Sequence, residues 1–197
     1  MKKIAVFFPG IGYHVDKPLL YYAKKLAKEK GYECFDIAYT CKMGNLCGNE
    51  ERIKEVFYIL YGQAKKQLDD IDFSQYDEVL FISKSIGTAI AAAYAKEIEK
   101  YFQELVDVDG YGRCRIKLKN ILYTPLKLTF LYEPHNAIAF TGTNDPWVET
   151  EQIIRECEKN NIPLFVIDKV NHSLEGENVQ DNINILKDVM KKTEEFL

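Results

Sequence analysis

Short apolar runs alternate along this chain with longer amphipathic stretches, and this alternation limits the possible folds more than any other feature. The runs are rich in β-branched and aromatic residues, which favours buried strands. The stretches between them repeat apolar residues at the spacing of one helix face. Strands that alternate with helices imply a mostly parallel sheet covered on both faces, because right-handed crossovers place successive helices there. The sequence therefore predicts an α/β fold with a sheet of about six strands.

The individual elements follow from these runs. Strands are predicted over residues 4–8, 33–39, 78–82, 120–123, 137–140 and 163–167. Helices are predicted over residues 18–30, 51–68, 88–101, 149–159 and 178–196, with surface loops at 40–49 and 107–115. The 197 residues are 47% hydrophobic and contain no linker-like segment, so we expect one domain spanning residues 1–197. Functional residues are expected where the parallel strands end.

Charge and composition narrow the classes of partner. The formal net charge is -4 and acids and bases are mixed, so the chain lacks the basic arm or stripe that binds nucleic-acid phosphates. The apolar run after Met1 breaks at Pro9, too early for a signal peptide, and no apolar stretch approaches the length of a membrane span. We therefore expect a cytoplasmic protein that binds neither nucleic acid nor membranes. The sequence does not indicate an oligomeric state.

The cysteines follow neither a disulfide pattern nor a metal-binding pattern. There are five of them, an odd number, and their spacing is irregular. Cys41 and Cys47 form the only close pair, but their separation and the absence of a nearby histidine miss the usual zinc spacings. A loop with free thiols is the preferred interpretation, and no metal site is predicted.

The strongest functional signal lies at the junction between the strand at 78–82 and the helix that follows it. The strand continues without a spacer into Ser83-Lys84-Ser85-Ile86-Gly87. A serine on such a turn stands clear of neighbouring side chains and next to a helix N-terminus, which favours developing negative charge. The turn requires small residues two positions before and two after the serine, and Ser83 and Gly87 meet this requirement. Capping of the helix is the alternative role for Ser85.

From the loop Pro9-Gly10-Ile11-Gly12 through Ser85 to Asp145 and His172, the chain resembles the α/β-hydrolase superfamily, in which nucleophile, acid and histidine occur in this order. Ser83 stands where the family motif G-x-S-x-G has its first glycine. The resemblance covers nearly the whole chain and is to small members without a cap, such as carboxylesterases and dienelactone hydrolases. The resemblance implies a compact single-domain α/β-hydrolase fold. The segment between Ser85 and Asp145 is too short to leave much room for a lid, so we expect an open site.

The resemblance assigns a catalytic triad. Asp145 follows the strand two after the one that carries Ser85 and matches the family's acid, and His172 follows the last strand and matches its histidine. His172 would take the proton of Ser85, while Asp145 would hold the imidazole in one tautomer. Asp168 is a rival acid that we interpret as part of a loop, and a turn with a helix cap is the alternative for Asp145.

The resemblance also implies the surroundings of the triad. The backbone N–H groups of Ile11 and Ile86 would form the oxyanion hole, and Gly12 is a further candidate donor. Tyr13 and Trp147 are expected to line the substrate site together with Gly12, although each could instead cover the edge of the core. Lys84 is expected at the surface or at a gate for substrate.

The predicted reaction is acyl transfer to Ser85 followed by attack of water, on a small ester, thioester or related acyl substrate. It requires no metal or organic cofactor. Two alternatives remain open: an acyltransferase that uses the same Ser85, and a non-catalytic binding protein in which Ser85 and Asp145 cap helices. The loop at residues 9–12 lacks the spacing of a phosphate-binding loop, so nucleotide binding is a minor alternative.

Overall fold

All the predicted strands pair into one six-stranded sheet, in the order β2-β1-β3-β4-β5-β6, and every neighbouring pair is parallel. The computed structural model describes residues 1–40, 46–109 and 116–197, with only the backbone of 104–109. The strands are β1 (Lys3–Phe8), β2 (Glu33–Asp36), β3 (Glu78–Lys84), β4 (Lys117–Tyr123), β5 (Ala137–Gly142) and β6 (Leu164–Ile167). The helices are α1 (Pro18–Glu29), α2 (Glu50–Leu68), α3 (Ile86–Asp109), α4 (Thr150–Lys159) and α5 (Val179–Phe196).

The position of a strand in the sheet explains its sequence. β3 lies in the interior of the sheet and is buried along its whole length, which accounts for its continuous apolar run. β2 and β6 are the two edge strands and are only partly buried. The sheet is therefore best protected along β3 and least protected at its two edges, β2 and β6.

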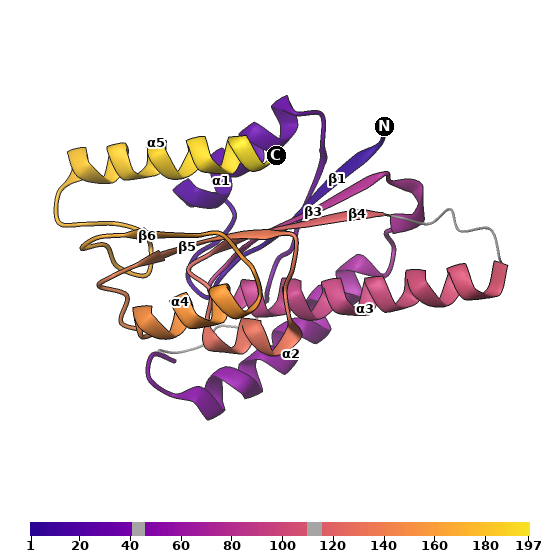
Figure 1. Ribbon diagram of the computed structural model, residues 1–197, viewed down its shortest axis with the longest axis horizontal. Coiled ribbons are helices and arrows are strands. Elements are labelled where there is room, and N and C mark those ends of the chain that lie inside the picture. The colour runs from indigo at the N-terminus through magenta and orange to yellow at the C-terminus, as the bar shows by residue number, and fades with distance from the viewer. Residues whose placement is uncertain (41–45, 110–115) are drawn as a thin grey trace.

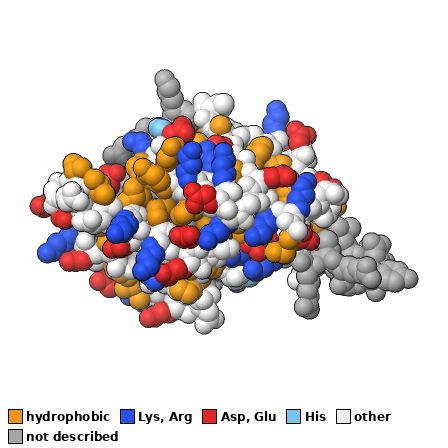
Figure 2. All heavy atoms as spheres, turned by 90° about the horizontal axis from the view of Figure 1, so that it is seen from above, with side chains coloured by type: hydrophobic (Ala, Val, Ile, Leu, Met, Phe, Trp, Pro, Cys, Tyr) orange, Lys and Arg blue, Asp and Glu red, His pale blue; other side chains and the backbone are white. Residues whose placement is uncertain are grey.

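The helices form a layer on each face of the sheet, as Figure 1 shows, with α1 and α5 on one side and α2, α3 and α4 on the other. Residues of β3 divide accordingly: Leu80 and Ile82 pack in the cluster that includes α1, whereas Val79 and Phe81 pack in the cluster that includes α2 and α3. Figure 2 views the α1 and α5 layer from above and shows acidic and basic side chains interspersed over that face.

Several features differ from the predicted elements. β2 ends at Asp36 rather than at residue 39, and β3 continues through Lys84 rather than ending at residue 82. Two short 3-10 helices, η1 (Phe73–Gln75) and η2 (Lys127–Tyr132), were not predicted, because segments of three and six residues are too short to give a periodic signal. α3 extends through Asp109, which lies inside the predicted loop at 107–115. Residues 110–115 of that loop, and Cys41 of the loop at 40–49, lie outside the described residues.

No domain-sized cap is inserted among the residues that the structure describes. Between β4 and β5 the chain forms only η2, whose Thr129 hydroxyl lies 2.6 Å from that of Thr88 in α3. Nor does any helix in these ranges combine the length and the apolar character needed to cross a membrane.

Candidate active site

Ser85 lies on the tight turn between β3 and α3, with a backbone φ of 57°, in the left-handed region. For a residue with a side chain this conformation costs about 1–3 kcal/mol, and it persists only where the surrounding structure enforces it. The backbone on both sides is fixed here. The Ser85 N–H donates to the carbonyl of Tyr123 at 3.0 Å, and the Ser85 carbonyl accepts from the N–H of Thr88 at 2.9 Å. The turn thus holds the Ser85 side chain at the end of an interior strand.

The two small residues of the turn are required for different reasons. A Cβ atom on Gly87 would lie 2.3 Å from the carbonyl oxygen of Phe8, so only glycine lets α3 begin this close to β1. Ser83 is fully buried, and its hydroxyl donates to the carbonyl of Ile121 at 3.0 Å. Serine therefore fits in the first-glycine position without leaving its buried hydroxyl unpaired.

His172 connects Ser85 to Asp145. Its Nε2 atom lies 2.7 Å from Ser85 Oγ, and its Nδ1 atom lies 2.6 Å from Asp145 Oδ2. With the proton of the neutral imidazole on Nδ1, this atom donates to the carboxylate and Nε2 accepts from the Ser85 hydroxyl. The three residues predicted as a triad are thus brought together from the loops that follow β3, β5 and β6.

The loop that carries His172 is held by its own hydrogen bonds and by a glycine of β5. Asn171 Oδ1 accepts from the Ser173 N–H at 2.7 Å, and the Asn144 N–H donates to the carbonyl of Val170 at 3.0 Å. A Cβ atom on Gly142 would lie 2.2 Å from that same carbonyl oxygen. Glycine at this position therefore lets the His172 loop reach the end of β5.

Asp145, rather than its rival Asp168, contacts the histidine. The Asp145 side chain is fully buried, and its second oxygen accepts from the Trp147 N–H at 2.9 Å. Asp168 is exposed, and its carboxylate accepts from the Thr143 hydroxyl at 3.0 Å. Asp168 thus belongs to the turn between β6 and the His172 loop.

Burial of the ring and the nearby Lys84 ammonium lower the pKa of His172, in that order of importance, while Asp145 acts in the opposite direction. The net effect keeps the imidazole neutral near neutral pH. This is the protonation state in which a histidine can accept a proton from a hydroxyl group.

Of the two predicted oxyanion-hole residues, Ile86 directly follows Ser85, and Ile11 follows Gly10, which approaches Ser85. Ile86 is the first residue of α3, where backbone N–H groups have no partner within the helix. The loop that holds Ile11 touches the turn, since a Cβ atom on Gly10 would lie 3.0 Å from Ser85 Cβ. Neither the Ile11 nor the Ile86 N–H donates to a backbone carbonyl elsewhere in the described ranges. Their role as oxyanion donors remains a prediction.

The three residues predicted to line the substrate site are placed differently from one another. Gly12 is exposed, with φ 70° and open space beside it. Tyr13 is only 7% exposed and its hydroxyl accepts from the Leu19 N–H at 3.1 Å, so it packs under the start of α1. Trp147 is half-buried, and its ring stacks on the imidazole of His172 with centroids 5.1 Å apart.

A cavity of about 780 Å³ lies beside the triad, between the start of α2, η2 and the loop that begins α4. Its lining includes Asp145 and Trp147 but not Ser85. The apolar part of the wall comes from Ile53, Leu126, Leu128, Leu131, Trp147 and Val148. Trp147 therefore separates this cavity from the imidazole of His172. Sequence reasoning missed the cavity because it depends on how α2 and η2 pack.

The expectation that Lys84 lies at the surface or at a gate is wrong, because this side chain is only 1% exposed. Side chains alternate along a strand, so Lys84 points to the same face as Leu80 and Ile82, beneath α1 and α5. The alternation along this strand is present in the sequence. A charged side chain is usually exposed, however, so the pattern was not applied to Lys84. Burial lowers the pKa of Lys84 to about 7, against the opposing effects of Asp145 and Glu175.

Metal-ligating side chains do not cluster in the described ranges: no three or more His, Cys, Asp or Glu side chains lie close enough together to hold an ion. Cys47, one member of the close cysteine pair, is half-buried, and its Sγ atom donates to the carbonyl of Pro146 at 3.2 Å. This contact joins the loop before α2 to the loop that carries Asp145.

No family model matches the sequence, and no curated protein is similar to it. Solved structures are similar over almost the whole chain. An α/β serine hydrolase without a lid from Xanthomonas campestris matches with a TM-score of 0.59 and 13% identity, over 98% of this chain and 80% of that one. An esterase from Pyrococcus furiosus matches with a TM-score of 0.62 and 14% identity, over 100% and 82%. The chain has the α/β-hydrolase fold.

A further structure with the hydrolase fold is Est1E from Butyrivibrio proteoclasticus with ferulic acid bound, which matches with a TM-score of 0.63 and 11% identity, over 100% of this chain and 88% of that one. These identities are low, so the likeness concerns the fold.

Proposed function

We propose that this protein is a serine hydrolase that cleaves a small ester, thioester or related acyl compound through an acyl-enzyme intermediate on Ser85. The observation that carries the proposal is the continuous hydrogen-bonded chain from Ser85 Oγ through His172 to Asp145, with distances of 2.7 and 2.6 Å. Serine, histidine and aspartate in this geometry are the parts of an activated nucleophile.

The reaction would proceed in two acyl-transfer steps. Ser85 Oγ attacks the substrate carbonyl carbon while its proton passes to His172 Nε2, and the tetrahedral intermediate collapses as the leaving group takes that proton. A water molecule then gives its proton to His172 and attacks the acyl carbon, which releases the acid and restores the Ser85 hydroxyl. The N–H groups of Ile11 and Ile86 would stabilise both oxyanions by about 3 kcal/mol per donor.

The cavity beside Trp147 supports a substrate with one apolar group. Its volume of about 780 Å³ and its wall of leucine, isoleucine and tryptophan side chains suit an apolar acyl or leaving group that extends past the triad. Lys54 and Lys127 also line it, so a polar end of the substrate would find a partner at the rim.

Labelling with a fluorophosphonate, followed by peptide mapping, tests the proposal. We expect one phosphonylated residue, Ser85, and complete loss of labelling in Ser85→Ala. Ser74→Ala, which alters an exposed serine of η1, serves as the matched control and should label like the parent protein. A folded protein that does not label at Ser85 would contradict the proposal and favour a binding protein of this fold.

Product analysis with 4-nitrophenyl esters of increasing chain length separates hydrolysis from acyl transfer. A hydrolase releases the free acid even when an alcohol is added, whereas an acyltransferase forms the new ester. Formation of the new ester as the main product would replace the hydrolase proposal with the acyltransferase.

A further inference from the structure

Lys84 is the most deeply buried basic side chain of the described residues, at 1% exposure. A buried ammonium is costly unless it is paired with a carboxylate and hydrogen-bonded. Lys119, the other buried lysine of the sheet, satisfies this rule: its Nζ lies 3.7 Å from Glu78 Oε1 and donates to the carbonyl of Phe196. Within the described ranges, Lys84 has no such hydrogen bond or ion pair. Its burial therefore needs another explanation.

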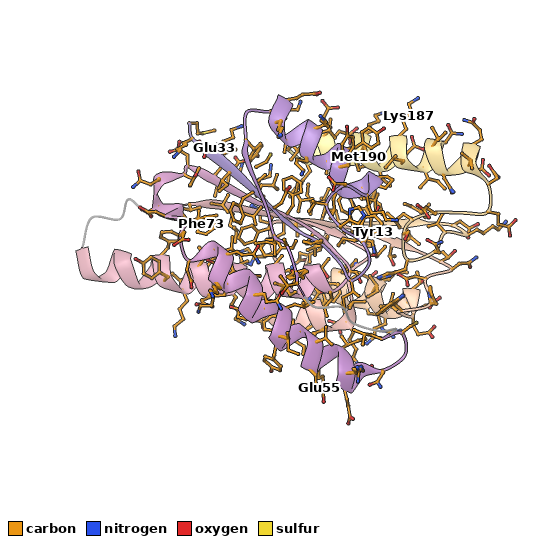
Figure 3. All side chains as sticks on the ribbon, turned by 180° about the vertical axis from the view of Figure 1, so that it is seen from behind. Tyr13, Glu33, Glu55, Phe73, Lys187 and Met190 are labelled. Carbon is orange, nitrogen blue, oxygen red and sulfur yellow. The ribbon has the colours of Figure 1, made fainter. Side chains whose placement is uncertain are left out.

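The direct contact of the Lys84 ammonium is an aromatic ring. Its Nζ atom lies 5.0 Å from the ring centroid of Tyr13, a distance at which a cation is attracted to the face of the ring. The Tyr13 hydroxyl accepts from the Leu19 N–H, which fixes the ring against the start of α1. Figure 3 labels Tyr13 on the side of the sheet that α1 and α5 cover. Tyr13 thus fixes the position of the Lys84 ammonium on this face of the sheet.

The charged groups that act on Lys84 come from the loops after β5 and β6. Asp145 and Glu175 favour the charged ammonium, and the ammonium in turn disfavours a charged His172. Two tyrosines of this face adjoin Lys84: Tyr13 contacts its ammonium, and Tyr123 is its partner in β4. Burial raises the pKa of Tyr13 to about 12 and raises that of Tyr123, so both phenols are neutral near neutral pH.

We propose that Lys84 is a positioning residue of this site, whose buried ammonium, held on the Tyr13 ring, keeps His172 in the neutral form that can accept the Ser85 proton. The catalytic consequence rests on the proposed hydrolase function, but the electrostatic effect on His172 does not. The residue acts through the imidazole and does not contact substrate.

The direction of the effect depends on pH. Below a pH of about 7 the Lys84 amine carries its proton and opposes protonation of His172, so the site stays active further into the acid range. Above that pH the amine is neutral and exerts little effect. The charge would also oppose the imidazolium that forms during reaction. The benefit is therefore confined to the acid side of the pH profile, and the plateau rate is not raised.

The direct test is an NMR titration of the histidine side chains in the parent protein, Lys84→Met and Lys84→Gln. The chain has three histidines, so the signal of His172 can be assigned with His172→Gln, and His14 and His135 serve as internal controls. We expect the midpoint of His172 to move to higher pH in both variants, while His14 and His135 keep theirs. A His172 midpoint that stays in place or moves to lower pH in either folded variant would overturn the proposal.

Kinetics give a second measurement, which requires hydrolase activity. In Lys84→Met we expect the acid limb of kcat/KM to move to higher pH, so that the deficit against the parent grows as the pH falls and vanishes on the alkaline plateau. Lys119→Met is the matched control, because it removes a buried lysine at the opposite end of the sheet. Lys119→Met should destabilise the protein, but the acid limb of its kcat/KM profile should stay at the same pH. A uniform loss at all pH values in Lys84→Met would indicate a packing defect and contradict the proposal. If no activity exists, the titration alone decides the effect on His172.

Discussion

The indole of Trp147 stacks on the imidazole of His172, with the ring centroids 5.1 Å apart and the planes inclined by 20°. The same tryptophan donates its backbone N–H to Asp145 and lines the neighbouring cavity. One residue thus contacts the proposed base, the proposed acid and the space proposed for substrate. It therefore links the orientation of the triad to the shape of the cavity.

Replacement of Trp147 by leucine should lower kcat by about 2- to 10-fold, since an aromatic pair contributes about 0.5–1.5 kcal/mol beyond its buried area. Trp147→Phe keeps a ring that can stack and should retain most of the rate. Steady-state kinetics on short and long acyl esters would measure both effects. Equal kcat in Trp147→Leu and the parent protein would show that the stacking does not orient His172.

Replacement of Asp145 by asparagine should lower kcat by about 10⁴-fold, because asparagine cannot stabilise the charged imidazole or select the same tautomer. The fold should be little affected, since the asparagine oxygen can still accept from the Trp147 N–H. Asp168→Asn is the matched control and should keep nearly full activity, because Asp168 is exposed and bonds to Thr143. If Asp168→Asn lost activity and Asp145→Asn kept it, the acid of the triad would be Asp168.

Replacement of Gly87 by alanine should destabilise the protein by at least about 1–3 kcal/mol, because the new methyl group meets backbone atoms of Phe8 and Pro9 that cannot move independently of β1. Gly62→Ala is the contrasting control. Gly62 is exposed within α2 and has no neighbour within 4 Å of an added Cβ, so alanine should stabilise the protein by about 0.5–1 kcal/mol. Urea unfolding would measure both changes, and a tolerated Gly87→Ala would refute the close approach of α3 to β1.

The stability of the protein should fall in acid because of Glu78. Burial alone would raise the pKa of Glu78, but the hydrogen bond from Tyr32 and the charges of Lys117 and Lys119 lower it overall. A carboxyl group whose pKa is lower in the folded state stabilises the protein above its unfolded pKa, here the ordinary value of 4.5, and loses this effect as the pH falls through the folded pKa.

Urea unfolding of the parent protein and Glu78→Gln at several pH values tests this expectation. Glu78→Gln should be less stable near pH 7 and should lose less stability on acidification. Glu177→Gln changes an exposed residue, and this variant should lose as much stability on acidification as the parent protein does. Identical acid sensitivity in Glu78→Gln and the parent would assign the effect to other carboxylates.

The strands, the helices and the proximity of Ser85, His172 and Asp145 could be predicted from the sequence, because each depends on local pattern or chain order. Ser85 follows an apolar strand directly, and Asp145 and His172 follow the later strands in the expected sequence. Lys84 and Tyr13 were harder to place, because their burial depends on how α1 and α5 cover the sheet. The end of α3 was misplaced because two glycines at residues 110 and 112 indicated a loop that began too early.

β6 is an edge strand that pairs with β5 alone, yet the loop that follows β6 carries His172. Ser85, in contrast, follows β3, which has a partner on each side. An edge strand of four residues can separate from its neighbour at a small part of the cost of global unfolding. Partial opening at this edge would therefore remove the base from the nucleophile while the rest of the molecule stayed folded. Loss of activity on heating should accordingly precede loss of helical structure, and amide exchange should be faster in β6 than in β3.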